Sequence, residues 1–164
     1  NKKYKDIFFV FHSTTEHLKK IQDLLLAEGF KNCGAIADNE IKSQVLKSSI
    51  FAVAKSGTIS LEICNAKIPS VIIYKMNFIN FLIIKMLVHA KFANIINIAA
   101  NKEIIPELLQ SKCNSKNIFK VVCNFLDTPL KAKEQVKKTQ IILSQFKTEN
   151  LSSELASKTL NRLL

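Results

Sequence analysis

The sequence predicts an α/β fold in which a mainly parallel sheet is followed by a helical tail. Over residues 1–128, short apolar runs of strand type alternate with segments of helical periodicity. This alternation is typical of parallel sheets with helices on both faces. Residues 129–164 have a helical pattern rich in Lys, Gln and Ser. With 164 residues, 48% of them hydrophobic, the chain is long enough to bury one substantial core.

The first predicted strand is the run IFFVF at 7–11, whose apolar side chains on both faces indicate burial within a parallel sheet. Thr14 or Thr15 can cap the helix that follows, and Asp38 or Asn39 can cap the next one. The elements predicted for this part of the chain are a strand at 7–11, a helix from about 15 to 28 that Gly29 ends, a strand at 33–37, a helix from 39 to about 48 and a strand at 50–54.

The second part of the chain continues the alternation and then becomes helical. Pro69 stops one helix, and Pro129 separates an α/β domain at 1–128 from the tail at 129–164. The predicted elements are a helix from 58 to about 67, a strand at 70–74, a helix at 78–88, a strand or extended segment at 93–98, short helices at 104–110 and 115–126, and a helical tail at 130–164.

The charge of the chain is strongly positive, with 24 basic and 13 acidic residues and a net charge of +11. Arg162 is the single Arg among the basic residues. Because readers of phosphates and bases depend on the Arg fork, we expect no nucleic-acid partner. The Lys-rich surface is instead solvated or faces an anionic membrane.

The cysteines and histidines show no metal-ligand spacing. They are Cys33, Cys64, Cys113, Cys123, His12, His17 and His89. We therefore expect no bound metal and no cofactor, core positions for Cys33 and Cys64, and a reducing cytoplasm.

Residues 71–88 are strongly apolar, but Lys75, Asn77, Asn80 and Lys85 interrupt them. A membrane span needs about 20 nearly uncharged residues, so a strand followed by a helix fits better. The apolar helix is either buried between sheet and tail, which we favour, or turned toward a membrane or acyl chains.

The segment from Ala54 to Glu62 is the first candidate site, because ligands of open α/β sheets bind where strands end. A strand runs into Ser56-Gly57-Thr58 and then into a helix, whose start presents unbonded N–H groups and a partial positive charge. Such a turn can hold a phosphate, with the two hydroxyls as further donors. Glu62, one turn along on the face of Thr58, can bind a ribose diol. The alternative is a plain cap followed by a surface charge.

The second candidate site is the polar cluster Asn97, Asn101, Lys102 and Glu103, which precedes the predicted helix containing Pro106. These side chains follow a predicted strand and can line the same cleft. The alternative is a capped loop without a function.

Three ordered motifs in this chain resemble the C-terminal part of lipid-A-disaccharide synthase. The family carries S-G-T-x-x-L-E, then P-M-V-x-x-Y-R, then L-P-N-L-x-A-G-x-x-V-P-E-L-L-Q. The matching residues are Ser56, Gly57, Thr58, Leu61 and Glu62, then Pro69, Val71 and Tyr74, then Asn97, Ala100, Pro106, Glu107, Leu108, Leu109 and Gln110. The resemblance covers about residues 5 to 126 and implies the Rossmann-like C-terminal domain of a B-type glycosyltransferase.

The resemblance implies a transfer of 2,3-diacylglucosamine from its UDP derivative to 2,3-diacylglucosamine 1-phosphate, giving the β-1,6 disaccharide of lipid A and UDP. Ser56, Gly57 and Thr58 would approach the diphosphate or ribose, and Glu62 would bind the ribose. Asn97 would lie near the donor, and Lys102 completes the expected binding set. The expected location is cytoplasmic, peripheral to the inner membrane of a Gram-negative bacterium.

Two departures from the family pattern are Asn101 in place of Gly and Lys102 in place of Arg. Asn accepts a left-handed backbone better than most residues, and Lys keeps the charge but not the fork. The sequence starts without Met and enters a strand by residue 7, so we expect the C-terminal part of a longer protein.

A Gly-Ser-Arg phosphate loop and a catalytic carboxylate would, by the resemblance, precede these residues. We therefore expect no catalytic residue in this chain and no turnover without an N-terminal domain or a homologous subunit. The competing interpretation is a non-catalytic remnant or a basic peripheral-membrane interaction module.

Overall fold

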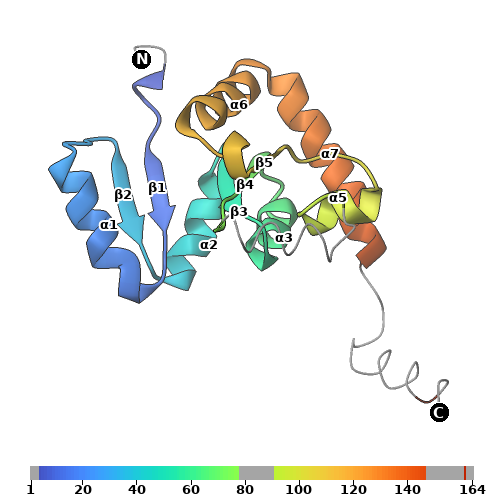
Figure 1. The fold of residues 1–164 in the computed structure, drawn as a ribbon, viewed down its shortest axis with the longest axis horizontal. Coiled ribbons are helices and arrows are strands. Elements are labelled where there is room, and N and C mark those ends of the chain that lie inside the picture. The colour runs from blue at the N-terminus through green and yellow to red at the C-terminus, as the bar shows by residue number, and fades with distance from the viewer. Residues whose placement is uncertain (1–3, 78–90, 147–160, 162–164) are drawn as a thin grey trace. The chain divides into compact units, whose positions relative to one another are not determined.

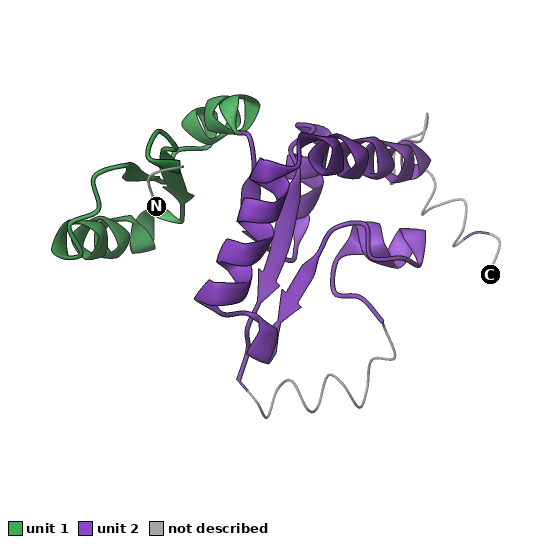
Figure 2. Cartoon of the chain, turned by 90° about the horizontal axis from the view of Figure 1, so that it is seen from above, with its two compact units in different colours: residues 1–49 green, residues 50–164 purple. Residues whose placement is uncertain are grey.

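A computed structural model describes residues 4–77, 91–146 and 161 of the chain (Figure 1). The chain divides into two compact units, residues 1–49 and residues 50–164 (Figure 2). Each unit contains a parallel sheet with helices packed beside it. The predicted α/β class with parallel strands, flanking helices and a helical tail is confirmed.

The first unit contains two strands and two helices. They are β1 (Phe9–His12), α1 (Thr15–Ala27), β2 (Cys33–Ile36) and α2 (Asn39–Ser48). The strands pair in parallel, with Phe9 opposite Cys33 and His12 opposite Ile36. All four elements occur where the sequence predicts them, within one or two residues.

Local signals explain these boundaries. Asp38 caps α2 by accepting a hydrogen bond from the backbone N–H of Ile41 at 2.8 Å. Gly29 follows α1 with a φ of 67°, which is the left-handed conformation that ends helices. Thr14 stands at the cap position of α1, but its hydroxyl pairs with the ring of His17 at 3.4 Å instead of capping the backbone.

The predicted burial of the first strand on both faces is wrong for this chain. All four residues of β1 are exposed, including Phe9 at 52% and Phe11 at 45%. The physical reason is that α1 packs against β2 rather than β1. The aromatic side chains of β1 therefore remain in contact with solvent.

The second unit contains the larger sheet, in the order β3-β4-β5. Its elements are β3 (Ala52–Lys55), α3 (Thr58–Asn65), β4 (Ser70–Tyr74), α5 (Ile95–Ala100), β5 (Glu107–Leu109), the 3-10 turn η2 (Gln110–Lys112), α6 (Ser115–Asp127) and α7 (Pro129–Phe146). All three strands are parallel. Their carboxyl ends therefore lie at one edge of the sheet.

The buried core belongs to the second unit. Its fully buried apolar side chains include Val71 and Ile72 on the central strand β4, Ile96 on α5 and Ile105 before β5. The tail helix α7 packs against α3, α5 and α6. It is thus an integral part of this unit, and Pro129 begins it at a position where proline is tolerated.

Two predicted elements have the opposite secondary structure. The segment expected to be extended at 93–98 contains helix α5, and the segment expected to be helical at 104–110 contains strand β5. Asn94 starts α5 by accepting a hydrogen bond from the N–H of Ile96 at 2.9 Å. Pro106 precedes β5, where the strand needs no N–H from it, rather than opening a helix.

The other predicted elements occur near their expected positions or lie outside the described residues, and of the two expected core cysteines Cys64 is buried whereas Cys33 is only half-buried. The predicted strand at 50–54 is β3, shifted toward the C-terminus by one or two residues, and the predicted strand at 70–74 is β4. The predicted helix at 78–88 and, apart from residue 161, the tail beyond Phe146 lie outside the described part of the chain.

Candidate functional site

The candidate site begins at the carboxyl end of β3, where Ser56-Gly57-Thr58 leads into α3. Gly57 has a φ of 149° and a ψ of −165°, a backbone conformation that residues with a side chain rarely adopt. A Cβ on Gly57 would meet nothing within 4 Å, so conformation rather than space requires glycine here. The sequence prediction of a tight turn at this point is confirmed.

The start of α3 has a Gly at the cap position, which supplies no side-chain oxygen to the first turn. Asp38 and Asn94, in contrast, cap α2 and α5 with their side chains. Gly57 contributes its carbonyl, which accepts bonds from the N–H and hydroxyl of Ser60 at 3.1 and 2.7 Å. The first N–H groups of α3 thus give the turn the partial positive charge that favours an anion.

The hydroxyl of Ser56 donates a hydrogen bond to the carbonyl oxygen of Ala93 at 2.7 Å. This bond joins the turn after β3 to the segment that leads into α5, 37 residues later in the chain. The first sequence motif is therefore linked to the segment that precedes the third.

Thr58 and Glu62 are both exposed on α3. Since they are four residues apart in a helix, their side chains lie on one face, as the sequence predicts. The carboxylate of Glu62 is thus carried about one turn beyond the opening of the helix.

Asn97 is completely buried on α5 rather than exposed in a loop. Its amide nitrogen donates to the carbonyl of Ile105 at 2.7 Å and to Glu107 at 2.8 Å. Its amide oxygen accepts from the backbone N–H groups of Ile104 and Ile105 at 2.8 and 2.9 Å. All four hydrogen-bonding capacities of an amide are used inside the protein, so Asn97 holds the segment before β5 in place.

Lys102 is exposed and follows Asn101, which ends α5. Its charge contributes, after the hydrogen bond and charge of Lys138, to a lowered pKa of Glu134 on α7. Lys102 therefore lies on the side of the unit where α7 runs, and the described hydrogen bonds do not join it to Ser56.

The end of β4 adds further groups at the same edge of the sheet. The ammonium of Lys55 lies 5.1 Å from the centre of the Tyr74 ring, a cation–π contact across β3 and β4. Gln110, with a φ of 50°, accepts from the N–H of Met76 at 2.9 Å and donates to its carbonyl at 3.3 Å. Gln110 thereby fixes the backbone that leaves β4.

The sequence did not predict that Glu107 belongs to the candidate site. It is buried at the start of β5 and accepts hydrogen bonds from the segment that holds Ser56. The available signal was an acidic residue in the otherwise apolar run of a strand, since a buried carboxylate must have donors around it.

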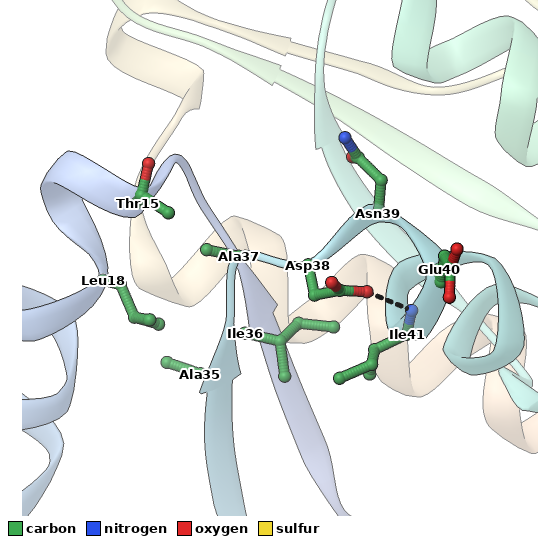
Figure 3. Close-up of a pocket in the computed structure, with 9 residues that line it drawn as sticks. All are labelled: Thr15, Leu18, Ala35, Ile36, Ala37, Asp38, Asn39, Glu40 and Ile41. Carbon is green, nitrogen blue, oxygen red and sulfur yellow. Dashed lines mark hydrogen bonds between the residues drawn. The ribbon is translucent and has the colours of Figure 1, made fainter.

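A separate pocket of about 640 Å³ lies in the first unit, at the carboxyl end of β2 (Figure 3). Thr15 and Leu18 of α1 and residues 35–41 line it. The apolar side chains form much of its surface, and the carboxylates of Asp38 and Glu40 make it unfavourable for a phosphate. The sequence motifs do not reach this pocket.

Within the described residues, no group of three or more His, Cys, Asp or Glu side chains could hold a metal ion. None of the helices in the described ranges is long and apolar enough to cross a membrane.

Comparison with known proteins gives a consistent result. A family model described as Lipid-A-disaccharide synthetase matches residues 1–160. A lipid-A-disaccharide synthase from Rickettsia conorii is 44% identical over 61% of this chain and 23% of its own length. Those from Rickettsia canadensis and Rickettsia typhi are 39% and 36% identical, over 70% and 74% of this chain and 30% and 33% of their own lengths.

The chain belongs to the lipid-A-disaccharide synthetase family. The resemblance noted from the three motifs is thereby confirmed, and all three motifs lie inside the matched range. The chain spans about a quarter to a third of the length of these relatives.

Proposed function

We propose that this chain is the donor-binding part of a lipid-A-disaccharide synthase, a glycosyltransferase of lipid A biosynthesis. The reaction transfers 2,3-diacylglucosamine from its UDP derivative to 2,3-diacylglucosamine 1-phosphate. A hydroxyl of the acceptor attacks the anomeric carbon as the bond from that carbon to the phosphate oxygen breaks. The products are the β-1,6 disaccharide and UDP.

One observation carries the proposal. The turn at the end of β3 has Gly57 at its centre, in a conformation almost restricted to glycine, and opens α3 at the carboxyl edge of a parallel sheet. Ligands of such sheets bind at this edge, and a helix start there favours a phosphate. Family membership makes a nucleotide sugar the expected ligand.

The site residues have separate proposed tasks. Gly57 and Thr58 bring the first N–H groups of α3 to the diphosphate, where they stabilise the charge that develops on the leaving UDP. Glu62 accepts hydrogen bonds from the ribose hydroxyls. Lys102 supplies positive charge near the donor. Asn97, whose amide is fully bonded, supports the site through the segment it holds.

The chain by itself is proposed to bind the donor without turnover. An attack by a hydroxyl needs a base to take its proton. By the resemblance, that base would belong to a domain outside residues 1–164. Residues 1–128 would form the nucleotide-sugar-binding domain and residues 129–164 its tail, with an N-terminal domain or a homologous subunit completing the site.

The lipid substrates imply work at a membrane surface. We propose a cytoplasmic location, peripheral to the inner membrane of a Gram-negative bacterium. The net charge of +11 supports attraction to anionic lipid.

A calorimetric titration of the chain with UDP tests the proposal. We expect UDP to bind, ADP to bind at least about tenfold more weakly, and Glu62→Ala to lower the UDP affinity by about 10-fold, as for loss of a charged hydrogen bond. Glu134→Gln, an exposed acid-to-amide change on α7, is the control and should leave the affinity unchanged. A cooperative thermal transition without UDP binding would favour the non-catalytic remnant instead.

A further inference from the structure

The carboxylate of Glu107 receives three hydrogen bonds inside the second unit. One oxygen accepts from the backbone N–H of Ala93 at 2.8 Å. The other accepts from the backbone N–H of Asn94 at 3.0 Å and from the side-chain amide of Asn97 at 2.8 Å. Because a buried carboxylate is stable only among donors, this geometry ties β5 firmly to the segment before α5.

The same segment holds Ser56 through a single peptide group. In the peptide between Ala93 and Asn94, the carbonyl accepts from the Ser56 hydroxyl and the N–H donates to Glu107. A peptide group is planar and rigid, so fixing its N–H also fixes the direction of its carbonyl. When the N–H of a peptide group donates to a carboxylate, the carbonyl of the same peptide group also becomes a stronger acceptor.

This arrangement determines what the Ser56 hydroxyl can offer a ligand. Its single proton is used at the Ala93 carbonyl, so the oxygen retains only its acceptor capacity. An acceptor oxygen repels the oxygens of a phosphate and pairs with an O–H of a ligand. Ser56 is therefore suited to a hydroxyl of the nucleoside rather than to the diphosphate.

We infer that Glu107 is a positioning residue for donor binding. It acts through the peptide between Ala93 and Asn94 and orients the Ser56 hydroxyl as an acceptor for a hydroxyl of the donor nucleoside. This inference rests on the proposed function and assigns the diphosphate to the N–H groups after Gly57 alone.

Coupled substitutions test the inference by UDP titration of the full 164-residue chain. Ser56→Ala should lower the UDP affinity by about 3- to 10-fold, the usual effect of one uncharged hydrogen bond. Glu107→Gln should have a similar effect, because the amide has one acceptor oxygen for donors that now bond to two, and its NH2 group repels the N–H it faces, which displaces the segment of Ala93 and Asn94. The double variant should bind no more weakly than the weaker-binding single variant, and Glu134→Gln should bind normally.

Uridine lacks phosphate, so its binding reports the contacts to the nucleoside without those to the diphosphate. We expect Ser56→Ala to weaken uridine binding by the same factor as UDP binding. Losses that multiply in the double variant would overturn the role of Glu107. An unchanged uridine affinity beside a weakened UDP affinity would overturn the assignment of Ser56 to the nucleoside.

A ligand-free measurement distinguishes failure of this inference from failure of the proposed function. In the NMR spectrum, Glu107→Gln should shift the backbone amide signals of Asn94 and Gly57 and leave those of the distant half of α7 in place. If the Gly57 signal does not shift, Glu107 does not position Ser56, even if UDP binds. If UDP does not bind at all, the proposed function fails, and so does the assignment of Ser56 to a nucleoside hydroxyl. The NMR spectrum still shows whether Glu107 positions Ser56. Should Glu107→Gln unfold, Glu107→Asp replaces it, since it keeps the charge but shortens the reach.

Discussion

Asn101 shows how a single substitution can leave a backbone unchanged. It ends α5 with a φ of 47° and a ψ of 32°, at the position where the family pattern has Gly. Asn adopts this left-handed conformation with less strain than most residues, as expected from the sequence. Gln110 and Lys67 also have positive φ values, of 50° and 60°. Neither residue type signals such a conformation, so the sequence did not predict them.

Gly57 permits a direct test of the turn after β3. Gly57→Ala should destabilise the second unit by about 1–3 kcal/mol, because its φ of 149° is almost restricted to glycine although a Cβ would have room. Urea unfolding measures this loss. Gly34→Ala is the matched control, since Gly34 has no positive φ and its new methyl would make an ordinary contact with Phe8 at 3.5 Å. Equal losses in the two variants would contradict a conformational role for Gly57.

Ionisation of the Cys64 thiol makes the free energy of unfolding depend on pH in the alkaline range. Burial raises the pKa of its thiol from 9.0 to about 11, against a smaller lowering by the hydrogen bond with Thr139. The neutral thiol is favoured in the folded chain, so its contribution is complete below pH 9.0 and is lost as pH rises toward and past 11.

The comparison with Cys64→Ala isolates this contribution. The variant should be less stable at neutral pH, because it leaves a small cavity, yet lose less stability as pH rises from 9.0 to about 11. Urea midpoints at the two ends of this range give both slopes, and the many lysines titrate equally in both proteins. Parallel slopes would mean that Cys64 ionises as easily in the folded chain as in the unfolded one.

At the scale of elements, the sequence predicted those with strong local signals. Caps such as Asp38 and terminators such as Gly29 located the helices of the first unit. The exchange of helix and strand between 93–98 and 104–110 had a different cause, because both segments are short and apolar. The three-residue strand β5 exists because it pairs with β4, and that pairing is a tertiary effect.

The candidate site divides in the same way. The turn around Gly57 and the face shared by Thr58 and Glu62 follow from local sequence. The bonds that place Asn97 and Glu107 inside the unit depend on residues up to fourteen positions apart and on a strand that was predicted as a helix. Periodicity alone could not reveal them.

A buried amide on the tail helix α7 bonds directly to the sheet. Gln135 accepts from the N–H of Ser70 at 2.6 Å and donates to the carbonyls of Ser70 and Ile104 at 3.0 and 3.3 Å. Gln135→Ala should destabilise the second unit by about 2–3 kcal/mol, because buried backbone groups lose their partner. Gln145→Ala, at an exposed position of α7, is the control and should change the urea midpoint little. A similar, small effect of both changes would show that the bonds of Gln135 do not hold α7 in place.

For the whole molecule, burial is distributed unequally between the two units. Among the described residues 4–49, no side chain is fully buried, whereas the buried core from Ala54 to Phe125 lies in the second unit. Local stability follows buried apolar contacts. Backbone amides of β1 and β2 should therefore exchange with deuterium markedly faster than those of β3 and β4, as measured by mass spectrometry or NMR. Equal protection of both sheets would contradict this difference.

The net charge of +11 leads to a prediction about membranes. Each basic residue near an anionic surface contributes about 1 kcal/mol of attraction, which salt screens over about 8 Å at physiological ionic strength. The chain should sediment with vesicles containing phosphatidylglycerol and detach from them at high salt. It should not bind vesicles of pure phosphatidylcholine. Lys133→Gln combined with Lys137→Gln, both exposed on α7, should weaken binding if this helix faces the lipid. Salt-resistant binding to neutral vesicles would instead indicate insertion of apolar side chains, and absence of binding to either vesicle would contradict a membrane role for this charge.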